Sequence, residues 1–331
     1  MASPSVSVTT LRPELAGSFM AFDMEGSRRG FIAGRALRPI NTMKKSGVHG
    51  KIPLNELLRT PQTKRAPKSG YARDDFQWET ASFACEEHGM EGVVDDEEAA
   101  MYRDYLDVER LAAMRAVDAV LRRAEIDASD TLFNTTTWTG SALTTAITNE
   151  WDDHTNAVPL DDVLAAKVKV FEGIGEWPNA LILPKSVFLH LRECAQVLDR
   201  LKYSGFKDPT AANVNEDVLA QVFDLRHILV AGAAKNSAIE GQTSTPVEVW
   251  SDEYAMVAKV AETDDIAEPC VGRSYLWDEI AMQGADGPLP WVFETYDEAA
   301  RRGSVVRARN YRQFAVLFAQ AAHLLSNVST N

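Results

Sequence analysis

The sequence predicts an α+β protein, in which helices and strands form separate runs instead of alternating regularly. Residues 95–125 carry an amphipathic helical pattern. Residues 291–298 and 303–318 have strand-like patterns on either side of a turn signal at 301–303. The rest of the chain has no internal repeat and no regular βαβ order. A length of 331 residues allows about two domains.

Charge is distributed unevenly along the chain. Residues 1–75 carry 13 Lys or Arg against 6 Asp or Glu, whereas residues 76–331 carry 21 against 42. The net charge of −14 disfavours a protein dedicated to binding nucleic acid or an anionic membrane. No segment is long and apolar enough to predict export or a membrane span.

The basic segment is expected to contain two strands, over residues 30–40 and 74–86. In the second, Phe76, Trp78 and Thr80 alternate with residues of the opposite face. A long basic connection between them predicts a protruding hairpin. Since an isolated hairpin is only marginally stable in water, we expect this one to be buried against a neighbouring subunit.

A long helix is predicted over residues 95–125. It begins with four acidic residues and ends with Arg122 and Arg123, which suits the helix dipole at both ends. At about 1.5 Å per residue it would span about 45 Å, longer than an average globular helix. We therefore interpret it as a spine along the molecule.

The remaining elements are short. A helix is expected from Leu160 to about Gly173, entered through Pro159 and followed by a turn at Trp177. A buried strand at 180–183, a helix after Pro184, and strands at 227–233 and 246–260 complete the set.

Motifs for catalysis or cofactor binding are mostly missing. The sequence has no GxxxxGK[ST], no GxGxxG after a strand, no HExxH and no CxxC. Cys85, Cys194 and Cys270 are interpreted as small core residues. The acidic run 95–98 is interpreted as a solvated helix N-terminus, because consecutive helical side chains diverge and cannot all converge on one magnesium ion. These features predict a protein that is not an enzyme and has no cofactor or metal.

Three segments carry a resemblance to a known family. They are VPLDDVLAAKVKVFEGIGEWPNALILPKSVFLHLREC, LRHILVAGAAKNSAIEGQ and VEVWSDEYAMVAKV. With the preceding arm, hairpin and spine, their order resembles that of a tailed-bacteriophage major capsid protein of the Hong Kong 97 type. The resemblance covers nearly the whole chain.

This resemblance implies an arm, an extended two-stranded loop, a spine helix, and peripheral and axial domains. The implied divisions are arm 1–28, extended loop 29–93, peripheral domain with spine helix 94–184, axial domain 185–289 and peripheral C-terminal strands 290–331. The start of the arm close to Met1 suggests either a separate scaffolding protein or none, and no large N-terminal cleavage. The family's cross-linking lysine and asparagine have no matching positions here.

The implied function is self-assembly into pentamers and hexamers of an icosahedral phage head that encloses double-stranded DNA. The implied partners are other copies, a scaffolding protein, a portal, in some phages a decoration protein, and DNA bound weakly without sequence specificity. The implied locations are the virion and, during assembly and procapsid maturation, the host cytoplasm, with no membrane contact.

The expected assembly interface consists of basic and aromatic residues of the arm and loop. They are Arg28, Arg29, Arg35, Arg38, Lys44, Lys45, Lys51, Lys64, Arg65, Lys68, Phe76 and Trp78. Two alternatives stay open. One is an encapsulin-type nanocompartment shell, and the other is a metal-dependent hydrolase using Asp95, Glu98 or His154.

Overall fold

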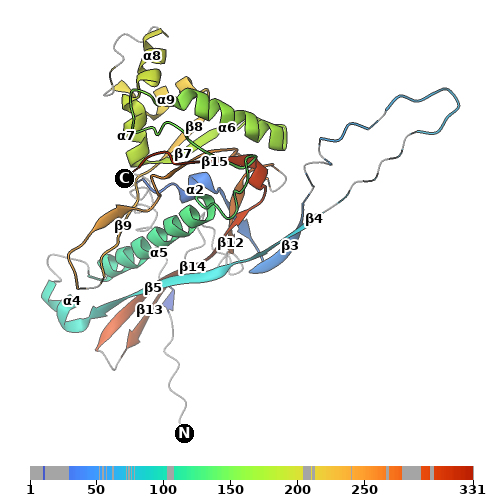
Figure 1. Cartoon of the computed structure of the whole chain (residues 1–331). Coiled ribbons are helices and arrows are strands. Elements are labelled where there is room, and N and C mark those ends of the chain that lie inside the picture. Colours follow the sequence, from blue (N-terminus) through green and yellow to red (C-terminus); the bar gives the residue numbers. More distant parts are fainter. Residues whose placement is uncertain are drawn as a thin grey trace.

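Two β-sheets organise the chain (Figure 1). The computed structural model describes residues 10–11, 30–51, 53, 56, 58–61, 63–71, 73, 75, 77, 79–102, 108–203, 210, 213–239, 241–265, 268–277, 292–298 and 302–330.

The first sheet has six strands in the order β1-β13-β14-β12-β2, and β5 also pairs with β14. Their bounds are β1 Thr10–Leu11, β2 Pro39–Thr42, β5 Glu86–Asp95, β12 Gly272–Trp277, β13 Val292–Glu298 and β14 Gly303–Val316. All pairs are antiparallel except β12 with β2. The long strand β14 is the centre of this sheet, because it pairs with β5 across ten residues and with β13 and β12 in succession.

Helix α5 (Val108–Leu132) packs on this sheet against β5 and β14. Small residues allow the close approach. A Cβ atom added at Gly92 in β5 would lie 2.9 Å from the Cβ of Ala112 in α5. The buried contact joins helix residues such as Val117 and Val120 to Val306 in β14. The shorter α4 (Asp96–Tyr102) precedes α5 and follows β5 directly.

The second sheet has five strands in the order β6-β15-β11-β7-β8. They are β6 Thr144–Ala146, β7 Ala180–Pro184, β8 His227–Ala231, β11 Tyr254–Ala258 and β15 Ala322–Ser326. Both faces are buried, since in β7 Ile182 belongs to one core cluster and Leu181 and Leu183 to another. An almost wholly apolar strand is typical of such a position.

Helices cover this sheet on the face that carries Leu181 and Leu183. They are α7 Lys185–Glu193, α8 Ala195–Tyr203 and α9 Glu216–Phe223. Helix α6 (Pro159–Ile174) contributes buried residues to both core clusters. The 3₁₀ turn η3 (Ala319–Ala321) leads from β14 to β15. The two-stranded sheet β9 (Ala234–Asn236) and β10 (Pro246–Glu248) projects from the side opposite the extended loop (Figure 1).

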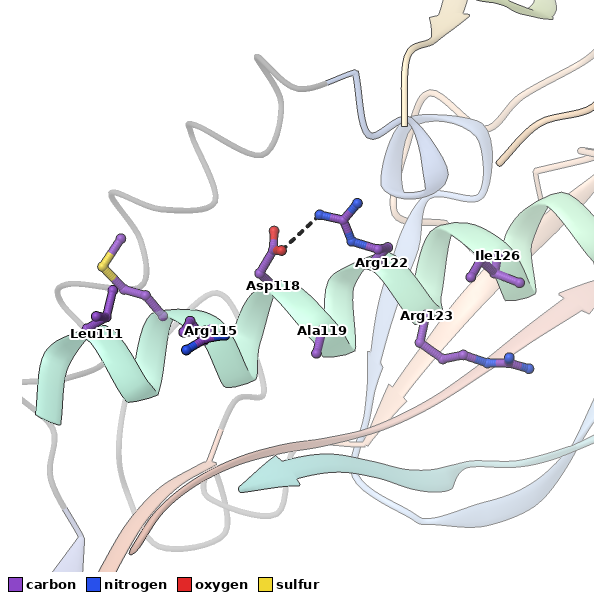
Figure 2. A pocket seen from close by; sticks show the side chains of 8 residues that line it. Leu111, Arg115, Asp118, Ala119, Arg122, Arg123 and Ile126 are labelled. Atoms are coloured by element: carbon purple, nitrogen blue, oxygen red, sulfur yellow. Dashed lines mark hydrogen bonds and ion pairs between the residues drawn. The ribbon is translucent and has the colours of Figure 1, made fainter. Parts of the chain in front are cut away.

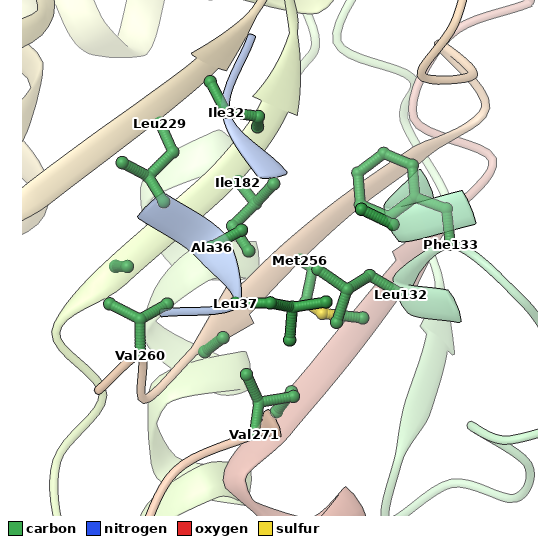
Figure 3. Packing of buried hydrophobic residues seen from close by; sticks show 14 of the residues in the cluster. Ile32, Ala36, Leu37, Leu132, Phe133, Ile182, Leu229, Met256, Val260 and Val271 are labelled. Atoms are coloured by element: carbon green, nitrogen blue, oxygen red, sulfur yellow. The ribbon is translucent and has the colours of Figure 1, made fainter. Parts of the chain in front are cut away.

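The other face of the five-stranded sheet, which carries Ile182, packs against the short helix α2 (Ala33–Ala36) and the end of α5 (Figure 3). Glu125 of α5 is buried here, with 2% of its surface exposed. Its carboxylate accepts hydrogen bonds from the backbone N–H of Ala33 at 2.6 Å and from Nε1 of Trp250 at 3.0 Å. One side chain thus joins three distant segments of the chain.

The pKa of Glu125 predicts a pH dependence of stability. Burial raises this pKa from 4.5 to about 6. The folded chain therefore holds the proton more tightly than the unfolded chain, so the stabilisation is complete below pH 4.5 and is lost as pH rises through 6. The loss corresponds to about 2 kcal/mol.

Urea unfolding between pH 4 and pH 7 measures this effect. We expect Glu125→Gln to remove this part of the pH dependence. The matched control Asp130→Asn, which changes an exposed acid on the same helix, should retain it. An unchanged pH profile in Glu125→Gln would assign the dependence to another group.

The predicted strand over residues 30–40 is wrong. Residues 33–36 form α2, and only Pro39–Thr42 form a strand. Ala33 and Ala36 lie on the buried side of this turn, and the Glu125 carboxylate binds its first N–H. The predicted hairpin nevertheless exists, between β3 (Ser46–Lys51) and β4 (Glu79–Ala84).

Two other elements differ from expectation. The predicted helix 95–125 is α4 and α5, and residues 103–107 between them lie outside the described residues. The predicted strand 246–260 is divided into β10 and β11, because Trp250 turns into the core between them. The predictions of α6, β7, α7, β8, β13 and β14 are confirmed in type and approximate position.

The domain divisions stay a prediction. The five-stranded sheet combines β7, which ends at the predicted boundary of residue 184, with β8 and β11 beyond it and β15 after residue 290. Strand pairing therefore crosses both predicted boundaries.

Candidate assembly interface

The extended loop leaves the body of the protein as an antiparallel hairpin. Strands β3 and β4 pair from Ser46 with Ala84 to Lys51 with Glu79. Beyond them the connection runs far out from both sheets (Figure 1). The described part of its tip, within residues 59–73, carries five cationic side chains and no acidic one.

Aromatic residues fasten the base of the hairpin to the six-stranded sheet. The Phe83 ring of β4 stacks on Tyr275 of β12, with centroids 4.9 Å apart and planes 12° apart. The backbone N–H of Ala84 donates to Oε1 of Gln313 at 2.7 Å. Burial raises the pKa of Tyr275 to about 12, so its hydroxyl stays protonated beside His49 Nε2, 3.3 Å away. The root of the loop is therefore fixed.

Three predicted interface residues are bound within their own chain. The Lys45 ammonium lies 4.7 Å from the ring centroid of Tyr311. Lys51 Nζ donates to the carbonyl of Leu317 at 2.6 Å. Arg38 Nε forms an ion pair with Asp264 at 2.7 Å. These cations hold the hairpin base and α2 in place.

The other described interface candidates face solvent. Lys44, Lys64 and Lys68 are exposed, as is Arg35 in α2. Arg65 is exposed too, and its guanidinium lies 4.6 Å from the ring centroid of Tyr71. Arg28, Arg29, Phe76 and Trp78 lie outside the described residues. As an assembly interface, the whole set stays a prediction.

Sequence reasoning missed the aromatic residues that hold the loop. Tyr275, Trp277 and Tyr311 come from β12 and β14, and Phe83 comes from β4. The alternation of Tyr275 and Trp277 is visible in the sequence. Their meeting with Phe83 depends on pairing across about 190 residues, which periodicity does not reveal.

A shallow groove on α5 is a second surface feature (Figure 2). It combines apolar side chains with Arg115, Arg122 and Arg123, and Arg122 is paired with Asp118 at 2.9 Å. Because this groove is itself cationic, its charge does not complement the basic loop tip.

Two of the three residues considered for metal chemistry, Asp95 and His154, have other partners, and the side chain of Glu98 lies outside what the structure describes. Asp95 Oδ1 accepts the backbone N–H of Glu97 at 2.8 Å, at the start of α4. His154 Nε2 lies 3.1 Å from Nδ1 of His190, which belongs to α7. Asp95 lies on another element, at the end of β5. Within the described ranges, no three His, Cys, Asp or Glu side chains converge as metal ligands would.

The prediction for the cysteines is confirmed, since all three are buried free thiols. Burial raises the pKa of Cys194 to about 12, so it stays protonated and unreactive at neutral pH. In the part of the chain that is described, no helix has the length and hydrophobicity needed to cross a bilayer.

Comparison with solved structures defines the fold. A phage-related protein from Bordetella bronchiseptica matches with a TM-score of 0.70 at 17% identity, over 98% of this chain and 99% of that one. The capsid of Myoviridae phage XM1 matches with a TM-score of 0.53 at 9% identity, over 90% and 92%. The SrpI encapsulin complex of Synechococcus elongatus matches with a TM-score of 0.52 at 10% identity, over 89% and 86%. The chain has the phage-capsid fold of the Hong Kong 97 type.

Sequence comparison points to one kind of protein within this class. The major capsid protein of Burkholderia phage BcepMu is 25% identical over 206 residues. The match covers 60% of this chain and 63% of that protein, so the chain spans less than two thirds of this curated relative. No protein-family model matches the chain. In both sequence and fold, the chain is similar to a phage major capsid protein.

Proposed function

We propose that the chain is a major capsid protein, whose copies form the pentamers and hexamers of an icosahedral phage head around double-stranded DNA. The main support for this proposal is the extended loop, which is fixed at its root and projects a cationic tip away from the body (Figure 1). A chain of net charge −14 offers acidic surfaces to such a tip on an adjacent copy.

The proposed contact combines burial of apolar groups with charge complementarity. Lys64, Lys68 and the stacked pair of Arg65 and Tyr71 provide cations and an aromatic ring on an exposed segment. Closed symmetry repeats each such contact around a ring, so a weak single contact stabilises the whole particle. In this role the chain needs no catalytic residue or cofactor.

We further propose that residues 94–184, with the spine helix, and residues 290–331 form the peripheral domain, and that residues 185–289 form the axial domain. A separate scaffolding protein, a portal and, in some phages, a decoration protein would join the copies in the host cytoplasm. DNA would be bound weakly, because the net charge of −14 repels phosphates.

Replacing the loop tip tests this function. A variant in which a Gly-Ser linker replaces residues 59–73 retains β3, β4 and their aromatic anchors. We expect it to keep the melting temperature of the wild-type monomer within a few degrees and to form no particles by light scattering and electron microscopy. Normal particles from this variant would remove the loop from the mechanism.

A tip with three of its five cations neutralised isolates the ionic part of the contact. Lys64→Gln, Arg65→Gln and Lys68→Gln together should weaken assembly most at low salt, because screening already weakens the wild-type contact at high salt. The matched control neutralises Lys185, Arg200 and Lys202, which are exposed on α7 and α8, outside the loop. Equal effects of both triple variants would point to net charge instead of the tip.

An encapsulin-type shell is the second candidate, because the encapsulin and phage XM1 structures match this fold almost equally well. The contents of particles made in the native host separate the two. Packaged double-stranded DNA supports the phage head, whereas a protein cargo with no DNA supports the nanocompartment. Neighbouring terminase and portal genes would also support the phage head.

A further inference from the structure

Helix α6 exposes large apolar side chains on the face away from its own core. Leu164, Val168 and Phe171 are 55%, 38% and 40% exposed. Their spacing of i, i+4 and i+7 places them on one stripe. The opposite face, which includes Val163 and Val170, is fully buried. A helix that is apolar on both faces is typical of an element covered on both sides.

Trp177 enlarges this stripe. Its ring is 53% exposed and stacks on Phe171, with centroids 4.7 Å apart and planes 19° apart. The left-handed conformation of Gly175, with a φ of 72°, ends the helix before Trp177. We call Leu164, Val168, Phe171 and Trp177 the α6 patch. Contiguous exposed apolar patches on soluble proteins commonly mark interaction sites.

The α6 patch adjoins the extended loop at Leu58, between β3 and the loop tip. Leu58 of the loop lies against Gly175, since a Cβ atom added there would be 2.8 Å from Leu58 Cδ2. Leu58 is itself 53% exposed. In Figure 1, α6 extends toward the side from which the loop projects. The patch and the loop therefore form one continuous surface.

Charges beside the patch are balanced within the chain. Lys169 pairs with Glu172 at 3.0 Å, and Lys259 pairs with Glu176 at 3.4 Å. Two copies of a chain with net charge −14 repel each other at a distance. Because the charges beside the α6 patch are paired, two copies can bring this apolar surface into contact with little local repulsion.

We propose that the α6 patch is covered by a second copy of this chain, namely the copy across which the extended loop reaches. The inference rests on the proposed assembly function and adds a contact between the bodies of the two copies. Because the patch is apolar, its contribution to assembly depends little on salt, whereas that of the cationic loop tip decreases as salt increases.

A substitution pair tests the contribution of the patch. Leu164→Gln with Phe171→Gln changes two exposed positions, so the melting temperature should stay within a few degrees of wild type. We expect the protein concentration at half-assembly to increase at least tenfold, at low and at high salt alike, which is about 1.4 kcal/mol. The matched control is Leu189→Gln on α7, which is 47% exposed and lies outside the patch.

Photo-crosslinking tests the identity of the occupant. A benzophenone amino acid at position 164, in a mixture of isotopically heavy and light chains, should give heavy–light cross-links only in assembled particles. Cross-links confined to the loop of the same chain, or no cross-links in particles, would overturn the proposal.

The outcomes separate this inference from the proposed function. If wild-type particles form and the double variant assembles equally well, the patch contact is wrong and the proposed function stands. If the wild type remains a monomer with and without a scaffolding protein, both are wrong.

Discussion

Alanine at position 125 is expected to lower the free energy of unfolding by about 4 kcal/mol. Among the described residues, the substitution removes the acceptor of two buried donors, the N–H of Ala33 and Nε1 of Trp250. Each buried donor left without a partner costs about 1–3 kcal/mol, and the lost side-chain volume adds a cavity term. Urea unfolding at pH 7 measures the effect.

Glu125→Gln is the informative companion. Its amide oxygen can accept one of the two hydrogen bonds, and at pH 7 the substitution also removes the buried charge, so we expect less than half the loss. The exposed acid Asp130 on the same helix serves as the control, and Asp130→Ala should change stability by less than about 0.5 kcal/mol. If Glu125→Ala lost no more stability than this control, the described hydrogen bonds would contribute nothing to the fold.

Alanine at position 127 is expected to cost about 3 kcal/mol, because it leaves a guanidinium buried without its carboxylate. Arg312 of β14 is 3% exposed, and its Nη2 lies 3.1 Å from Oδ2 of Asp127 in α5. Its Nη1 donates to Oδ1 of Asn310 at 3.2 Å. This ion pair fastens the spine helix to the central strand of the six-stranded sheet.

Two comparisons make the Asp127 prediction specific. Arg312→Met removes the charge itself, and we expect it to cost less than Asp127→Ala. Asp118→Ala breaks a more exposed pair with Arg122 on the same helix and should cost under about 1 kcal/mol. Thermal or urea unfolding ranks the three variants, and equal losses in all three would mean that burial of Arg312 is unimportant.

Local sequence patterns correctly predicted the elements whose structure is determined by neighbouring residues in the chain. Helix α6 follows from Pro159, its apolar period and the glycines that end it. Strand β7 follows from a short apolar run between turn signals. The hairpin with a projecting tip follows from composition, although its first strand is predicted at 30–40 and lies at Ser46–Lys51.

The errors come from contacts between distant residues. Residues 33–36 are helical where a carboxylate 92 positions away binds the first N–H, and no local pattern encodes that partner. Lys51 resembles the other loop cations in sequence, but it binds a carbonyl 266 residues away. Sequence reasoning therefore identified a basic loop without separating the cations that anchor its base from those exposed on its tip.

Exposure was the other quantity that sequence could not supply. Val163 and Leu164 are adjacent apolar residues of one predicted helix, and only the first is buried. Periodicity gives the angle between them but not which face meets the core when both faces are apolar. The α6 patch is visible only once the sheet that α6 covers is in place.

The path of the chain from the loop into the sheet has a mechanical consequence. Strand β4 leads through Cys85 directly into β5, whose ten residues all pair with β14. Hydrogen bonds of an antiparallel ladder lie perpendicular to the strands, so tension applied along this path shears the ladder as a whole instead of peeling it bond by bond. A pull on the tip is thereby transmitted to β14, the longest strand among the described residues, so the loop can bear mechanical load.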